Sequence, residues 1–176
     1  IGSGKSVVSR ILKNAGIPVY IADDEAKRLM LNHTGIKADL INLLGEDAYI
    51  HGQLNKQVIA DYLFANPSNT QKIHNIVHPR VKEDIFNWYA VHSSEPILAM
   101  ESAILFEANF QDTVDYSILV YTPKEIRVSR VINRDQISSE LVEKKIDTSG
   151  NAFGCTCDTF RAFVFNVVCV STSHGN

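Results

Sequence analysis

The chain has 176 residues, 45% of them hydrophobic, and its 17 Lys and Arg against 20 Asp and Glu leave a formal net charge of −3. A chain of this size can bury one sizeable core with a small appended subdomain. The charge balance provides no general field to attract nucleic acid or an anionic membrane, and no apolar run approaches the roughly 18 to 20 residues that cross a bilayer. The N-terminus also lacks a signal-peptide pattern. We therefore expect a cytoplasmic enzyme without nucleic-acid or membrane partners.

The first six residues read I-G-S-G-K-S, the closing part of a phosphate-binding loop G-x-x-x-x-G-K-S/T. Glycines let backbone N–H groups turn toward a polyphosphate, Lys5 can reach the β- and γ-phosphates, and Ser6 can hold Mg²⁺. An apolar stripe at helical spacing follows in Val7, Val8, Ile11 and Leu12. A helix N-terminus would then face the phosphates, which an ordinary turn does not require. The candidate nucleotide-binding residues are Gly2, Ser3, Gly4, Lys5, Ser6 and Val7.

Short apolar runs alternate with helical stretches along the chain. Residues 17–21, 97–100 and 116–121 have the length of buried parallel strands. Gly16 is placed to end the first helix, and a second helix is expected from Asp23. This alternation predicts an α/β fold of the P-loop NTPase type, a parallel sheet flanked by helices with ligands at the carboxyl ends of the strands. The strand before the loop would lie mid-sheet, so without it we expect exposed hydrogen-bonding edges.

The long segment between the first two strands is predicted to be a helical insertion. Asn55 precedes a helical pattern that runs through Phe64, Ser68 and Gln71 have capping-box spacing, and Pro79 suits a first helical turn. The predicted organisation has a nucleotide-binding core at residues 1–35 and 93–146, an acceptor-binding insertion at 36–92 and an atypical tail at 147–176. A helical lid is expected at about 124–146.

The lid prediction depends on a basic helix. Residues 122–125 combine a cap, Pro and Glu, which predicts a helix to about Arg134. Arg127, Arg130 and Arg134 share one face with Lys124, and guanidinium groups suit phosphate because they form a charged, bidentate fork. A basic face is usually only solvated, but beside a phosphate loop we assign Arg130 and Arg134 to the transferring phosphoryl group. The role of Arg127 stays open.

Carboxylates follow two of the predicted strands. Asp23 comes directly after the first strand, where a base could accept the proton of an acceptor hydroxyl. Asp24 is interpreted as a helix cap. Glu101 and Glu107 flank residues 102–106, where they could contact the substrate or the water shell of a metal, or simply end elements. Glu107 is retained as a candidate substrate-binding residue.

His78, Pro79 and Arg80 lie at an apparent helix junction, where His78 could contact a polar ligand and Arg80 an anionic one.

Metal sites other than that of nucleotide-bound Mg²⁺ are not expected. The other five His have no metal-ligand spacing, and the Cys155-x-Cys157 pair has no second pair to complete a zinc site.

Together these segments resemble the dephospho-CoA kinase family over residues 1–146. The resemblance is carried by I-G-S-G-K-S, G-I-P-V-x-x-A-D, I-V-H-P-R, S-A-I-L-F-E and R-x-x-x-R-D, in that order. It implies transfer of the γ-phosphoryl group of ATP to the ribose 3′-hydroxyl of dephospho-CoA, with Mg²⁺. It also implies catalytic roles for Lys5, Asp23, Arg130 and Arg134. The acceptor side would include His78, Pro79, Arg80 and Glu107.

The sequence departs from the family pattern at three places. Ile21 stands where the family usually has Asp, and the strand before the loop is absent. The last thirty residues contain no Lys or Glu but four Phe and every Cys. This change in composition suggests translation in another frame or an assembly fault. Residues 162–170 are nevertheless apolar enough for a strand.

Three other interpretations remain. The first is another small-molecule kinase of the nucleoside monophosphate type, against which the I-V-H-P-R segment argues. The second is a nucleotide-binding module such as a GTPase-like switch, although no N-K-x-D sequence specifies guanine. The third is an inactive fragment, because both ends depart from the family pattern.

Overall fold

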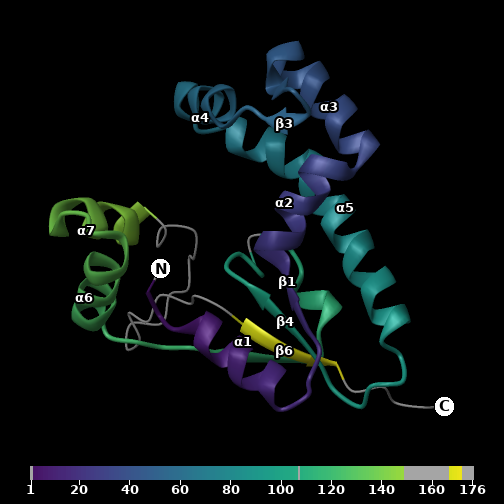
Figure 1. The fold of residues 1–176 in the computed structure, drawn as a ribbon, viewed down its shortest axis with the longest axis vertical. Helices are drawn as coiled ribbons and strands as arrows, with labels where there is room; N and C mark the ends of the chain where they lie inside the picture. Colours follow the sequence, from purple (N-terminus) through teal and green to yellow (C-terminus); the bar gives the residue numbers. More distant parts are fainter. Residues whose placement is uncertain (1, 107, 149–166, 172–176) are drawn as a thin grey trace. The chain divides into compact units, whose positions relative to one another are not determined.

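The computed structural model describes residues 2–106, 108–148 and 167–171, which fall into two compact units (Figure 1). The first unit consists of residues 1–19 and 95–176, and the second of residues 20–94. The chain therefore leaves the first unit within a strand and returns to it just before the next strand of the same sheet. None of the helices in the described ranges is long and apolar enough to cross a membrane.

The first unit is built on a sheet with the strand order β1-β4-β6-β5. Its elements are α1 (Lys5–Asn14), β1 (Val19–Ile21), β4 (Leu98–Ser102), η2 (Gln111–Thr113), β5 (Tyr116–Leu119), α6 (Lys124–Asp135), α7 (Ser139–Thr148) and β6 (Val167–Ser171). β6 runs antiparallel to both β4 and β5, so β4 and β5 point in the same direction. The predicted α/β class is confirmed, and β6 is the reversed strand.

β6 occupies the place where unpaired strand edges were expected. Cys169 is the register partner of Met100 in β4 and also of Ser117 in β5, so the facing edges of both strands are paired. An unpaired edge attracts any strand that can complete its ladder, which explains why an apolar tail segment fills this position. β6 overlaps the predicted strand at residues 162–170, whose first part, 162–166, lies outside the described residues.

α1 is closed by a glycine and packs on the sheet through one face. Gly16 adopts a φ of 83°, its N–H donates to Lys13, and the Ile17 N–H donates to Leu12, each over 3.0 Å. These are the two bonds of a Schellman motif, as the position of Gly16 predicted. The predicted apolar stripe is only partly inward, because Val7 and Ile11 are 49% and 61% exposed.

The second unit is a helical cluster with a short hairpin. Its elements are α2 (Ala22–Asn32), α3 (Thr34–Leu44), η1 (Glu46–Ala48), β2 (Tyr49–Ile50), β3 (Gln53–Leu54), α4 (Lys56–Ala65) and α5 (Asn69–Val91). Helices α2, α3 and α4 all pack on the long helix α5. Ile36 and Leu40 of α3 are completely buried in this core. The predicted helical character of this segment is therefore confirmed.

The expected helix junction at Pro79 is wrong, because α5 continues through that residue. An internal Pro costs a helix about 3 kcal/mol. Buried residues on both sides offset this cost, since Ile73, Val77, Val81 and Ile85 recur every four residues and are at most 8% exposed. Each such burial contributes roughly 1.5–3 kcal/mol, so packing along one face outweighs the local break.

Two helix caps in the second unit have different outcomes. Asn55 caps α4 as predicted, because its Oδ1 accepts from the N–H groups of Gln57 and Val58. The capping box of Ser68 and Gln71 does not form. The Ser68 hydroxyl donates to Asn66 over 2.9 Å, and Gln71 donates to Asn75. Asn66 precedes the helix, and its side chain binds the serine hydroxyl that would otherwise cap the helix.

Candidate active site

The glycine-rich loop adopts backbone conformations that require glycine and lies against α6. Gly2 and Gly4 have φ values of 75° and 95°. A Cβ atom at Gly2 would lie 2.8 Å from the carbonyl oxygen of Arg127. Gly4 is the N-cap residue of α1, and its carbonyl accepts from the Val7 N–H at 2.9 Å. The open N-terminus of α1 therefore directs backbone donors toward the loop, which favours an anion there.

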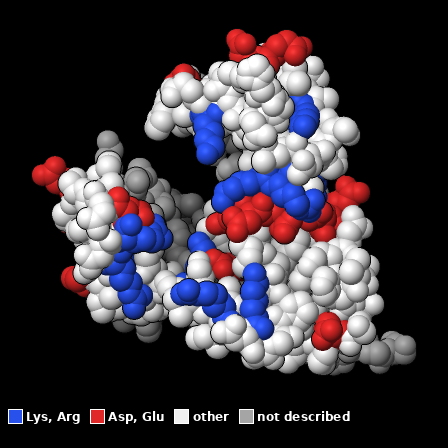
Figure 2. All heavy atoms as spheres, in the orientation of Figure 1, with Lys and Arg blue, Asp and Glu red and all other residues white. Residues whose placement is uncertain are grey.

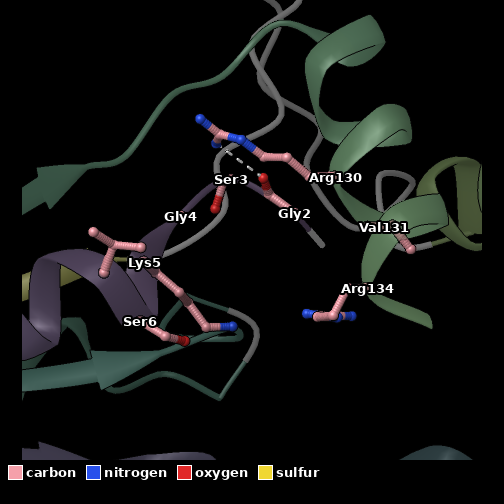
Figure 3. Close-up of a pocket in the computed structure, with 9 residues that line it drawn as sticks. Gly2, Ser3, Gly4, Lys5, Ser6, Arg130, Val131 and Arg134 are labelled. Carbon is pink, nitrogen blue, oxygen red and sulfur yellow. Dashed lines mark hydrogen bonds between the residues drawn. The ribbon is translucent and has the colours of Figure 1, made fainter.

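The loop and α6 together line a pocket of about 270 Å³. Its lining residues are Gly2, Ser3, Gly4, Lys5, Ser6, Val7, Arg130, Val131 and Arg134. Figure 3 shows Arg130 extending from α6 over the loop, while Lys5 and Arg134 extend into the space between α1 and α6. The pocket belongs entirely to the first unit and contains three cationic side chains. All six candidate nucleotide-binding residues thus share one cavity with Arg130 and Arg134.

Thr122 connects the loop to the start of α6. Its hydroxyl donates to the carbonyl oxygen of Ser3 over 2.8 Å. Arg130 adds two longer bonds of 3.4 Å, to the Gly2 carbonyl and to the Thr122 hydroxyl. Thr122 was expected to cap α6, but that helix begins after Pro123 without a side-chain cap. The hydroxyl serves the loop instead, because the buried Ser3 carbonyl needs a donor.

The basic residues of α6 differ in their environment. Arg127, whose role was left open, is 4% exposed and does not line the pocket. Arg134 is held by Asp135 through bonds of 2.6 and 2.9 Å, and this bonding raises the pKa of Arg134. The two bonds use Nε and Nη2 of Arg134. Asp135 therefore fixes the orientation of the guanidinium, and neither of these two bonds uses Nη1.

Glu101 is a buried carboxylate at the carboxyl end of β4, beside the first turn of α1. Its side chain is 6% exposed, and Oε1 lies 4.0 Å from the Lys5 ammonium. The Ser6 hydroxyl donates to the same Oε1 over 3.2 Å, and the Ser9 hydroxyl donates to Oε2 over 2.5 Å. Carboxylate and hydroxyl oxygens are hard donors of the type that Mg²⁺ accepts. The described residues contain no group of three His, Cys, Asp or Glu side chains able to hold a metal without further ligands.

Asp23 lies in the second unit, in the first turn of α2. It is half-buried, and it follows the end of β1 after a single residue, because α2 begins at Ala22. Asp24 does not cap the helix as expected, since the cap position is Ile21 and Asp24 pairs with Lys27 over 2.8 Å. Because the helix starts directly at the end of the strand, Asp24 lies inside the first turn, where its negative charge interacts favourably with the helix dipole.

The predicted acceptor-side residues lie on α5 in the second unit. The ring of His78 stacks on that of His74, with centroids 4.2 Å apart. Burial and the neighbouring His74 lower the pKa of His78 to about 4. Arg80 donates to Asp39 of α3 over 3.1 Å, and Pro79 is exposed. Glu107 lies outside the described residues.

Charges of both signs occur on the displayed surface. On the face drawn in Figure 2, Lys and Arg gather in several groups, one of which lies beside a group of Asp and Glu. This distribution agrees with the formal net charge of −3. Within this mixed surface, Lys5, Arg130 and Arg134 line the pocket together.

Comparison with known proteins decides the family. The sequence model of dephospho-CoA kinase matches residues 1–150. The chain belongs to the dephospho-CoA kinase family. A dephospho-CoA kinase from Bacteroides fragilis is 44% identical over 146 residues, covering 83% of this chain and 71% of that protein. One from Porphyromonas gingivalis is 39% identical, covering 83% of this chain and 72% of its own length.

Solved structures share the fold. A crystal structure from Thermus thermophilus has a TM-score of 0.71 and 30% identity, covering 84% of this chain and 75% of its own. The dephospho-CoA kinase from Campylobacter jejuni has a TM-score of 0.57 and 21% identity, covering 85% and 76%, and supports the fold alone. As a member of the dephospho-CoA kinase family, the chain is a transferase that uses ATP and acts on a small molecule.

Two residues of this kinase site were missed by sequence reasoning. Ser9 was not considered, and Thr122 was interpreted only as a cap. A signal for Ser9 exists, because it follows Ser6 by three residues and so shares its helix face. Two hydroxyls on one helix face can share a polar partner. Thr122 gave no comparable signal, since its contact is with a residue 119 positions away.

Proposed function

We propose that this chain transfers the γ-phosphoryl group of ATP to the ribose 3′-hydroxyl of dephospho-CoA, giving coenzyme A and ADP. The observation that supports this proposal is the pocket of about 270 Å³, in which a glycine loop, Lys5, Arg130 and Arg134 converge within one unit. Such a group of donors and cations fits a triphosphate tail. A cytoplasmic location is part of the proposal, because the proposed substrates are small and diffusible.

Within this proposal the loop binds phosphate and the cations stabilise the transferring group. The backbone N–H groups of residues 2–7 surround the β- and γ-phosphates, and Lys5 neutralises their charge. Arg130 and Arg134 act from α6, which belongs to the lid. Charge developing on the equatorial oxygens in the transition state interacts with these fixed cations, which lowers the barrier.

The residues beside the loop fit Mg²⁺ as an ATP-bound cofactor. The Ser6 hydroxyl keeps its lone pairs while it donates to Glu101, so it can ligate a cation and remain oriented. Glu101 supplies a buried carboxylate that can accept hydrogen bonds from metal-bound water. When bound, Mg²⁺ would be held by Ser6, with Glu101 beside it, and would neutralise part of the charge of the phosphates.

Asp23 is proposed as the base. The oxygen of the acceptor hydroxyl forms a bond to the γ-phosphorus, and the bond from that phosphorus to the β,γ-bridging oxygen breaks. The hydroxyl proton passes to the Asp23 carboxylate, and ADP leaves with the electron pair of the broken bond. His78, Pro79, Arg80 and Glu107 are proposed for the acceptor side, with Arg80 suited to an anionic group of the acceptor.

The decisive experiment measures ADP formation with Mg-ATP and a panel of acceptors. The panel contains dephospho-CoA, adenosine and nucleoside monophosphates, and we expect turnover with dephospho-CoA alone. Turnover with a nucleoside monophosphate instead would reassign the acceptor, and absence of ATP binding would overturn the proposal.

A matched pair of variants tests the base. Asp23→Asn is expected to reduce turnover at least a hundredfold, within the range of general base catalysis, while ATP binding stays near wild type. Asp24→Asn is the control, because Asp24 pairs with exposed Lys27 and should leave turnover within about twofold of wild type. Equal turnover in the two variants would remove Asp23 from the base role.

A further inference from the structure

Both oxygens of the Glu101 carboxylate are held by hydroxyl groups from one face of α1. Ser6 and Ser9 are three residues apart, so their side chains lie on the same side of the helix. Ser6 donates to Oε1 over 3.2 Å, and Ser9 donates to Oε2 over 2.5 Å. The carboxylate therefore receives one donor on each oxygen.

The two oxygens face different surroundings. Ser9 is 3% exposed and is not among the residues that line the pocket, whereas Ser6 lines it. The Lys5 ammonium is 4.0 Å from Oε1. A hydroxyl has a single O–H, and that of Ser9 is directed at Oε2. Rotation of the carboxylate would break this short, charge-assisted bond and leave a buried oxygen without its donor.

We propose that Ser9 is a positioning residue, which fixes Oε2 of Glu101 so that Oε1 is presented to Ser6, Lys5 and the divalent cation that accompanies ATP. This inference rests on the proposed function. Ser9 does not touch nucleotide or metal in this role and acts only through Glu101. Loss of a group that orients a metal-site residue typically lowers metal affinity by about 10- to 100-fold.

A purely structural role for Ser9 makes a different prediction. The bond joins α1 to β4, so its loss could simply loosen the first unit. A loosened unit would bind ATP more weakly whether or not the cation is present. A positioning role weakens only the part of binding that depends on the cation, so the two roles are separated by the dependence on Mg²⁺.

The test uses two equilibrium titrations of the full chain: Mg²⁺ is added at a fixed concentration of a fluorescent ATP analogue, and the analogue is added in EDTA. Ser9→Ala is expected to raise the Mg²⁺ concentration at half-saturation about tenfold, with little change in EDTA. Ser9→Cys, which keeps the shape but is a weak donor, should behave similarly and serves if Ser9→Ala does not fold. Thr113→Val is the stability control, because it removes a buried 2.7 Å bond to Phe110 within the same unit, and neither residue lines the pocket.

A double-variant cycle tests whether Ser9 acts through Glu101. Glu101→Gln alone should weaken the part of ATP-analogue binding that depends on Mg²⁺. In a chain that carries Glu101→Gln, Ser9→Ala should weaken that binding no further. Additive losses, equal losses with and without Mg²⁺, or a Ser9→Ala titration identical to wild type would each overturn the role of Ser9. A wild-type chain that fails to bind ATP would instead overturn the proposed function, so the two failures are distinguishable.

Discussion

The hydroxyl of Thr122 donates a 2.8 Å hydrogen bond to the carbonyl oxygen of Ser3. This bond joins the phosphate loop to the segment between β5 and α6. Ser3 is 5% exposed, so water does not readily replace the lost donor. The conformation of the loop therefore depends on a residue of the segment that leads into α6.

We expect Thr122→Val to weaken ATP binding roughly 2- to 10-fold, because a buried hydrogen bond contributes about 0.5–1.5 kcal/mol. The substitution preserves shape and leaves the Ser3 carbonyl without its donor. Thr122→Ser keeps the hydroxyl and should retain most of the affinity. Titration with a fluorescent ATP analogue measures both variants, and equal affinities would show that the bond does not support the loop.

Gly2 and Gly16 offer a comparison between crowding and backbone strain. Both have positive φ, but a Cβ at Gly2 meets the Arg127 carbonyl at 2.8 Å, whereas a Cβ at Gly16 meets nothing within 4 Å. Gly16→Ala should cost about 1–2 kcal/mol of unfolding free energy through strain alone, with ATP affinity near wild type. Gly2→Ala should also displace the loop and lower ATP affinity at least tenfold. Urea unfolding and ATP titration of both variants check this, and unchanged ATP binding in Gly2→Ala contradicts it.

Much of the fold could be predicted because its signals are local. The strand at β1, the glycine that closes α1 and the cap at Asn55 each depend on residues within one or two turns. Pro79 was misplaced for the opposite reason. Its local effect opposes a helix, and only the buried face that continues from Ile73 to Ile85 overrides it. That face is visible in the sequence, but its burial depends on helices elsewhere in the chain.

The meeting of the loop with Arg130 and Arg134 was predictable from the loop motif and the spacing of the two arginines. The pairing of Glu101 with Ser9 was not, because the two residues are 92 positions apart. Pattern reasoning gives the face on which a hydroxyl lies, whereas its partner comes from the neighbouring strand. The reversed strand β6 is likewise a tertiary outcome, since an apolar run alone does not specify its direction.

Asp84 joins α5 to both Tyr20 and α2. The Tyr20 hydroxyl donates to Asp84 over 2.7 Å, and Arg28 donates to both of its oxygens over 2.7 and 2.8 Å. Tyr20 is 2% exposed and packs edge-on against Trp88. Burial and then Asp84 raise the pKa of Tyr20, which keeps the phenol protonated as a donor. The three side chains form one network.

We expect unequal costs when this network is broken at different points. Tyr20→Phe should lower the unfolding free energy by about 1 kcal/mol, since Arg28 still satisfies Asp84. Asp84→Ala should cost about 2–3 kcal/mol, because it leaves the buried Tyr20 hydroxyl without an acceptor and removes one of the two carboxylates that Arg28 contacts, the other being Glu25. Urea unfolding measures both, and an equal or smaller cost for Asp84→Ala would show that the network is not shared.

His78 should make the stability of the second unit depend on pH. Burial, and then the charge of His74, lower the pKa of His78 from 6.5 to about 4. The folded chain therefore holds this ring neutral, while the unfolded chain takes up a proton as the pH falls below 6.5. Because the unfolded state binds more protons between these values, the unfolding free energy falls with decreasing pH. The stabilisation is complete above pH 6.5 and is lost progressively toward pH 4.

For this partly exposed ring the expected loss between pH 7 and pH 5 is about 1–2 kcal/mol after allowance for solvent screening. Urea unfolding across this range measures it. His78→Gln should flatten the dependence, because the titrating group is gone. His74→Gln should flatten the pH dependence less than His78→Gln does. It removes the titration of His74, whose own pKa is lowered by burial, and the smaller of the two causes that lower the pKa of His78. If the unfolding free energy of wild type and of His78→Gln changed equally with pH, His78 would not control the acid sensitivity of this unit.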